Sequence, residues 1–188
     1  MVFPRPSPYR HGMNPEEPMM TQERDVPPIT DVELSHAVQS DACVLFTGDH
    51  ETAEALARRL HALSGWRHGP FVAVDCALPD AEPRLLQSLD VENLEAPVGA
   101  TWPRLSQSGT VFLREVDKLD PALQRRLSDR LATLKTQPGA ERRLRRRVIS
   151  SSSTRLESRV KEGTFDARLF YRLNVIHMVI SKNNAPTW

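Results

Sequence analysis

The sequence of 188 residues predicts an α/β fold in which a parallel sheet is covered by helices on both faces. From residue 31 onward, short apolar runs alternate with stretches of helical periodicity. The apolar runs are continuous rather than alternating, which is typical of strands buried on both faces. They predict a five-stranded sheet, with strands at residues 43–48, 71–76, 110–116, 146–152 and 175–180.

The segments between these runs have the features of helices. Asp31 is a suitable cap for a short helix that continues to Val38. Residues 52–63 place leucines and alanines at helical spacing, and Pro121 suits the first turn of a helix over residues 122–134. Shorter helices are expected at residues 81–89, 155–162 and 166–173.

The two ends of the chain differ from this pattern. Residues 1–30 are rich in proline and methionine and show no apolar periodicity, which predicts a flexible arm. We therefore expect an arm at residues 1–30, one α/β domain at residues 31–180 and a tail at residues 181–188.

Composition excludes several classes of protein. Lys plus Arg number 25 and Asp plus Glu number 24, a balance that argues against a polycation coating nucleic acid or membrane. No apolar run is long enough to span a bilayer, and the first residues lack the apolar core of a secretory signal. Cys43 and Cys76 form no disulfide framework, so we expect a cytoplasmic protein. The histidines show no metal-ligand spacing, so no metal site is expected.

Several segments resemble one family. GTVFLREVDKLDPALQRRLSDRL, PFVAVDCALPD and the stretch from RRVISSS to FYRLNV resemble, in matching order, the AAA+ domain of bacterial enhancer-binding proteins, the activators of sigma-54 RNA polymerase. The resemblance covers roughly residues 41–180 and implies a P-loop, AAA+ type core with strand order 5-1-4-3-2. The family continues into a helical lid, and because the chain ends at residue 188 we expect the lid to be absent.

The resemblance places the nucleotide-binding loop of the family at TGDHETAEA, where Gly48, Asp49, Thr52 and Ala53 are the candidate cofactor-binding residues. Such a loop needs glycines whose amides wrap the phosphates and a lysine that neutralises them. Gly48 remains, but the lysine position falls on Ala53, or on Glu54 if no gap is allowed. We expect a plain strand–turn–helix corner and no cofactor, with ATP and Mg²⁺ bound only if the family activity is retained.

The family's magnesium-binding aspartate corresponds to Arg114, and its water-polarising glutamate to Glu115, here a vestigial catalytic residue. Arg114 either fills the magnesium position and pairs with a carboxylate such as Asp49, or extends into solvent. The sensor asparagine of the family falls on Ser153.

Two arginines of the family act across a subunit interface, and they correspond to Asp166 and Arg172. Arg172 is therefore either an arginine finger offered to an ATP-holding partner or a salt-bridged surface residue. Arg168 stands where the family has aspartate.

Two further features bear on partners. The loop that grips sigma-54 in the family corresponds to residues 90–108, which lack the G-A-F-T-G-A signature; Trp102 within it is either a contact anchor or folded onto the domain. We do not expect direct DNA binding; the arginine run from Arg142 to Arg147 is the single candidate for it, with a solvated loop as the alternative.

Three interpretations of function follow. The first is a transcription-regulation protein that acts through contacts with an AAA+ activator or sigma-54 RNA polymerase, with hydrolysis lost. The second is an ATP-binding AAA+ ATPase with an atypical site. The third is a non-functional gene fragment.

Overall fold

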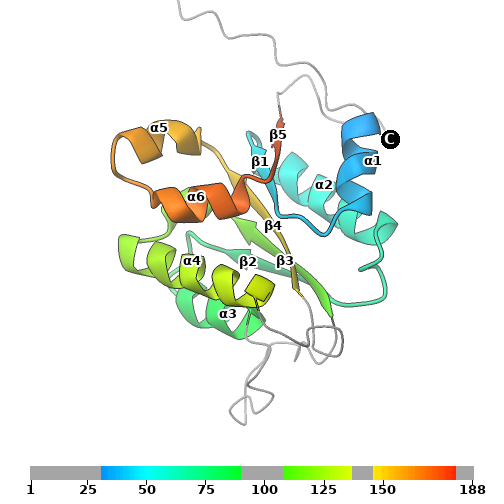
Figure 1. The fold of residues 1–188 in the computed structure, drawn as a ribbon, viewed down its shortest axis with the longest axis horizontal. Helices are drawn as coiled ribbons and strands as arrows, with labels where there is room; N and C mark the ends of the chain where they lie inside the picture. Colours follow the sequence, from blue (N-terminus) through cyan, green and yellow to red (C-terminus); the bar gives the residue numbers. More distant parts are fainter. Residues whose placement is uncertain (1–30, 90–107, 137–145, 181–188) are drawn as a thin grey trace, which may run out of the picture.

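Five parallel strands form one sheet in the order β2-β3-β4-β1-β5 (Figure 1), and both the sheet and its order were predicted. The strands are β1 (Val44–Thr47), β2 (Phe71–Asp75), β3 (Gly109–Arg114), β4 (Arg146–Ser152) and β5 (Ile176–Val179). This computed structural model describes residues 31–89, 108–136 and 146–180. The predicted arm and tail, Trp102 and most of the loop at residues 90–108 lie outside the described residues.

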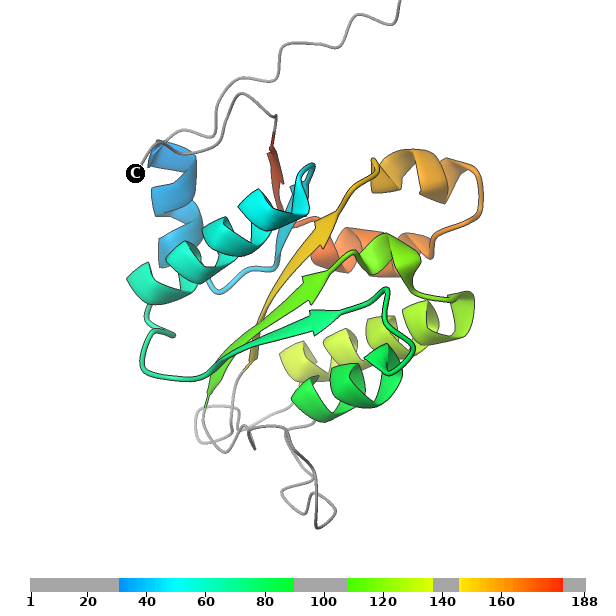
Figure 2. The ribbon, with the colours of Figure 1, turned by 180° about the vertical axis from the view of Figure 1, so that it is seen from behind.

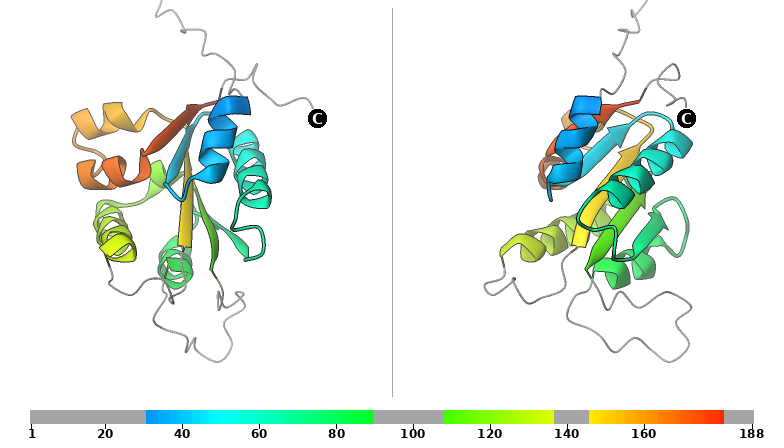
Figure 3. Two further views of the ribbon diagram at one scale, coloured as in Figure 1. Left: turned by 45° about the vertical axis from the view of Figure 1, so that its right-hand side comes forward. Right: turned by 90° about the vertical axis from the view of Figure 1, so that its right-hand side faces the viewer.

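Helices cover both faces of the sheet, which gives three layers (Figure 2, Figure 3). The helices α1 (Asp31–Gln39) and α2 (His50–Leu63) pack on one face through a core that includes Leu60 and Phe112. The other face carries α3 (Ala81–Leu89), α4 (Pro121–Thr136), α5 (Leu156–Lys161) and α6 (Ala167–Leu173), together with the 3-10 turn η1 (Val116–Lys118). None of the described helices is long and apolar enough to cross a membrane.

Short-range hydrogen bonds explain where the helices begin. The Asp120 carboxylate accepts from the amides of Ala122 and Leu123 at 2.8 and 2.9 Å, so α4 begins at Pro121 as predicted. The Asp166 carboxylate accepts from the amide of Leu169 at 2.8 Å and starts α6 in the same way. Asp166, aligned with an interface arginine of the family, is thus a helix cap in this chain.

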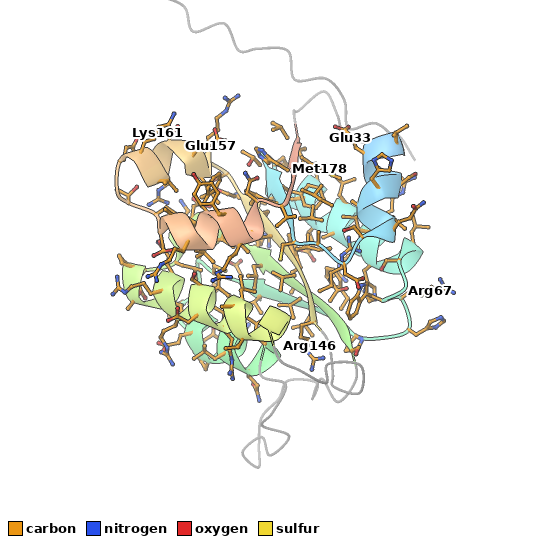
Figure 4. The ribbon with its side chains drawn as sticks, in the orientation of Figure 1. Glu33, Arg67, Arg146, Glu157, Lys161 and Met178 are labelled. Carbon is orange, nitrogen blue, oxygen red and sulfur yellow. The ribbon has the colours of Figure 1, made fainter. Side chains whose placement is uncertain are left out.

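The last two arginines of the basic run are part of the core. Arg147 is fully buried in β4, and its Nη2 donates to the carbonyl of Ala37 near the end of α1. Arg146 is 9% exposed, and its Nε donates to the carbonyl of Ser88 at 3.3 Å; Figure 4 shows it at the end of the sheet remote from α5. The solvated loop and the DNA-binding run are therefore both wrong for Arg146 and Arg147, while residues 142–145 lie outside the described residues.

His61 of α2 is a partly buried imidazole that packs between α2 and the sheet. Its Nδ1 lies 2.9 Å from the hydroxyl of Thr110, and its ring meets Phe71 edge-on. Burial, followed by the nearby charges of Arg147 and Arg58, lowers the pKa of His61 below its ordinary value of 6.5. The unfolded chain therefore binds the proton more readily than the folded chain.

We expect the free energy of unfolding to fall as the pH decreases from 7.5 to 5.5, and part of this fall to disappear in His61→Gln. Urea unfolding followed by circular dichroism at the two pH values measures the change in both proteins. An equal pH dependence in the variant and the parent would contradict the assignment to His61.

Candidate functional site

The carboxyl ends of β1, β3 and β4 lie at one edge of the sheet, where α/β proteins form their ligand sites. The predicted site residues gather there because each follows a strand. Gly48 and Asp49 follow β1, Glu115 follows Arg114 at the end of β3, and Ser153 follows β4, with its side chain exposed.

The corner between β1 and α2 contains only two residues, Gly48 and Asp49. The Asp49 carboxylate accepts from the amide of Thr52 at 2.8 Å, and the amide of Ala53 donates to the Asp49 carbonyl at 3.0 Å. The hydrogen bond from Thr52 lowers the pKa of Asp49 below its usual value. Ala53 is fully buried against the sheet. A carboxylate therefore caps the helix end that a phosphate would otherwise approach.

Gly48 is required by packing. Its φ is +137°, a conformation that residues with a side chain rarely adopt, and a Cβ placed on it would lie 2.2 Å from the carbonyl oxygen of Ile180. The close approach of Ile180, the residue that follows β5, is therefore enough to explain a glycine at position 48.

Glu115 is held by a residue that the sequence analysis missed. His50 Nε2 lies 2.9 Å from Glu115 Oε1, with 27% and 20% of the two side chains exposed. The backbone of Glu115 is left-handed, with φ 53° and ψ 52°, and its amide donates to the hydroxyl of Ser151 at 3.3 Å. His50 Nδ1 is buried and has no hydrogen-bond partner among the described residues. The imidazole of His50, in the first turn of α2, thus contacts the carboxylate of Glu115.

Arg114 lies beside Asp75, the residue opposite it in the pairing of β2 with β3, at 3.9 Å between Nη1 and Oδ2. The predicted pairing of Arg114 with Asp49 is therefore wrong, because Asp49 is the cap of α2 and the strand register brings Asp75 alongside instead. Arg114, which the resemblance aligns with the magnesium ligand of the family, is thus a cation with Asp75 as its neighbouring carboxylate.

A buried carboxylate follows Glu115. The side chain of Asp117 is 1% exposed, and neither of its oxygens has a hydrogen-bond partner among the described residues. Lys118 Nζ lies at 3.7 Å and Arg159 Nη1 at 3.9 Å, and Arg159 also donates to the Asp117 carbonyl. Asp117 therefore ties the end of β3 to α5 through Arg159.

Comparison with known proteins identifies the family. Residues 29–179 match the Sigma-54 interaction domain. The chain belongs to the sigma-54 activator family. It is 34% identical over 157 residues to the Sigma54-dependent transcriptional activator SfnR of Pseudomonas putida, covering 76% of this chain and 41% of that protein. It is 36% identical over 152 residues to the regulatory protein AtoC of Escherichia coli K12, and the match covers 75% of this chain and 32% of that protein.

A solved structure of NtrX from Brucella abortus in complex with ADP superposes with a TM-score of 0.62 and 26% identity, covering 78% of this chain and 34% of that one. The chain thus spans less than half the length of these relatives. The superposition agrees with the AAA+ core that the resemblance implied.

The residues of this member of the sigma-54 activator family do not fit the complex of ATP and Mg²⁺. The loop between β1 and α2 is too short to wrap phosphates, Asp49 caps the helix end, and Arg114 replaces the metal ligand. The structure adds His50, Ser151 and Asp117 to the predicted residues. Each of them contacts a residue far away in the sequence, and no sequence motif predicts such contacts.

The remaining candidates lie away from this cluster. Arg172 is half-buried in the last turn of α6, with its Nε buried and unpartnered among the described residues, and Arg168 is exposed. Cys76 is buried, and burial, more than the charge of Asp75, raises the pKa of its thiol, which disfavours a reactive thiolate.

Proposed function

We propose that this chain is a cytoplasmic transcription-control protein of the sigma-54 activator family that acts through protein contacts and has lost nucleotide hydrolysis. The observation that carries the proposal is the corner at Gly48 and Asp49, after which α2 begins at His50. A P-loop holds phosphates with backbone amides of an extended loop, whereas here those residues are helical.

Charge at the site supports the same function. The Asp49 carboxylate takes up an amide at the start of α2, and Arg114 puts a positive charge at the position that the resemblance aligns with the magnesium ligand. Glu115, engaged by His50, has no metal-bound nucleotide whose attacking water it could polarise. The proposed partners are sigma-54 RNA polymerase or an AAA+ activator that holds ATP, toward which Arg172 is offered in trans.

We expect no saturable binding of a fluorescent ATP analogue with Mg²⁺ up to about 1 mM nucleotide, since the corner has neither the extended loop of amides nor the lysine that hold phosphates. Fluorescence titration of the full chain measures this, with NtrX of Brucella abortus, which has been solved in complex with ATP, as the positive control. The double variant His50→Ser with Arg114→Asp removes the imidazole from Glu115 and the cation from the position aligned with the magnesium ligand, and it should also fail to bind, because the short corner persists.

Binding at micromolar concentrations by the parent chain would overturn the proposal and favour the atypical ATPase. Turnover that vanishes in Glu115→Gln would then assign the catalysis. Binding by the double variant alone would locate the defect in two side chains rather than in the backbone. Capture by a full-length activator that is lost in Arg172→Ala would support the partner half of the proposal.

A further inference from the structure

The helix α1 has less to hold it in place than its neighbour α2. It is nine residues long, and a helix of that length is marginal in water without tertiary contacts. Its buried apolar residues are Leu34 and Ala37, while Val32 is 63% exposed. α2 is 14 residues long, buries four apolar side chains and is capped by Asp49. α1, drawn in blue beside α2 in Figure 3, is therefore kept in place by a small apolar contact.

The guanidinium of Arg147 lies against the end of this helix. Its Nη2 donates to the carbonyl of Ala37 in the last turn of α1, which also accepts from the amide of Ser40 at 3.3 Å. A cation at a helix C-terminus is favourable in itself. The side chain of Arg147, however, is fully buried, and its Nε and Nη1 have no hydrogen-bond partner among the described residues.

This arrangement makes burial of the cation costly. Burial lowers the pKa of Arg147 below its ordinary value, while the charge of Asp41 acts in the opposite direction. Buried N–H groups without a partner lose their hydration and gain nothing in return. If α1 moved away, water could reach the guanidinium from that side. The charge of Arg147 therefore opposes the closed position of α1, which Leu34 and Ala37 favour.

The link between α1 and β1 is fixed independently of α1. The indole Nε1 of Trp66, which follows α2, donates to Oδ1 of Asp41 at 3.0 Å. The amide of Ala42 donates to the hydroxyl of Ser40 at the same distance. The chain is thus held at Asp41, just before β1 begins. A movement of α1 can therefore take place before Asp41 and leave the sheet unchanged.

We propose that α1 is a detachable latch, which opens near residues 39–40 while the five strands stay paired, and that hydration of the Arg147 guanidinium favours the open position. Burial of Leu34 and Ala37 favours the closed position. The first described helix thus has two positions of similar free energy. The latch requires no nucleotide, so it goes beyond the function proposed above and does not depend on it.

Hydrogen exchange of the full chain, followed by mass spectrometry at about pH 7, tests the latch. We expect the amides of α1 to exchange at least about 100-fold faster than those of α2. Low urea should leave the exchange of α1 unchanged, because a local opening exposes little surface. Exchange of α1 as slow as that of α2, or acceleration by urea equal to that of α2, would overturn the proposal.

Two arginine variants test the part played by charge. Arg147→Met keeps an unbranched apolar stem and removes the buried cation, so it should slow the exchange of α1 by about tenfold. Arg146→Met is the matched control, because Arg146 is also buried but donates to the carbonyl of Ser88 in α3 on the other face. It should leave the exchange of α1 unchanged. Exchange of α1 that is unchanged or faster in Arg147→Met would show that Arg147 does not favour opening.

Thiol labelling provides a second measurement that keeps Arg147 in place. Ala37 of α1 and Ala57 of α2 are both fully buried, so Ala37→Cys and Ala57→Cys form a matched pair in a background of Cys43→Ser with Cys76→Ser. We expect the thiol in Ala37→Cys to react at least about 100-fold faster, at a rate that low urea does not change. Equal rates in the two variants would overturn the latch even if Arg147→Met failed to fold.

Discussion

Gly48→Ala is expected to lower the free energy of unfolding by about 3 kcal/mol or more, because two independent costs fall on one residue. The backbone at φ +137° is accessible almost only to glycine, and the added methyl group would meet the Ile180 carbonyl oxygen at 2.2 Å. Urea unfolding monitored by circular dichroism measures the loss.

Two other glycines provide matched controls. Gly163 has φ +71° with nothing within 4 Å of a built Cβ, so Gly163→Ala should cost only the conformational strain, about 1 kcal/mol. Gly65 has neither problem, so Gly65→Ala should change stability by less than about 1 kcal/mol, in the stabilising direction. If Gly48→Ala proved as mild as Gly163→Ala, packing against Ile180 would not explain why this glycine is present.

Arg159→Met is expected to lower the free energy of unfolding by about 2 to 3 kcal/mol, since it removes a cation from a carboxylate that is almost fully buried. The loss is at the lower end for such pairs because the Arg159 side chain is 30% exposed and Lys118 remains near Asp117. The hydrogen bond from Arg159 to the Asp117 carbonyl is lost as well.

A double-mutant cycle isolates the charge interaction. Adding Asp117→Asn to Arg159→Met should recover at least half of the loss, because an amide at residue 117 no longer needs a cation. Lys161→Met, an exposed change on the same helix, should shift stability by less than about 0.5 kcal/mol. Strict additivity of the two single effects would show that Asp117 and Arg159 do not interact.

The strands were predictable from the sequence, since continuous apolar runs such as residues 43–48 and 71–76 are typical of strands inside a covered parallel sheet. Their order was implied only by the resemblance to the AAA+ family, and the structure confirms it. The absence of the phosphate-binding lysine was equally plain. The sequence did not predict that α2 begins at residue 50 rather than 52, because this start depends on the Asp49 carboxylate accepting a hydrogen bond from the amide of Thr52.

The contacts that define the site could not be predicted, because they join residues far apart in the chain. His50 and Glu115 are separated by 65 positions, and the left-handed backbone of Glu115 has no signature in a residue type that rarely adopts it. The strand at residues 146–152 was predicted correctly, but a charge count does not show that the first two residues of that strand, Arg146 and Arg147, are buried.

The short corner between β1 and α2 also limits what a single substitution can change. A lysine introduced at Glu54 would project from the second turn of an intact helix, where Glu54 now pairs with Arg58 at 2.8 Å. Opening a phosphate loop at this corner would require that turn to unwind, which gives up the Asp49 cap and the burial of Ala53 at the same time. Such a change would lower the free energy of unfolding, whereas a single substitution such as Glu54→Lys would leave the corner closed.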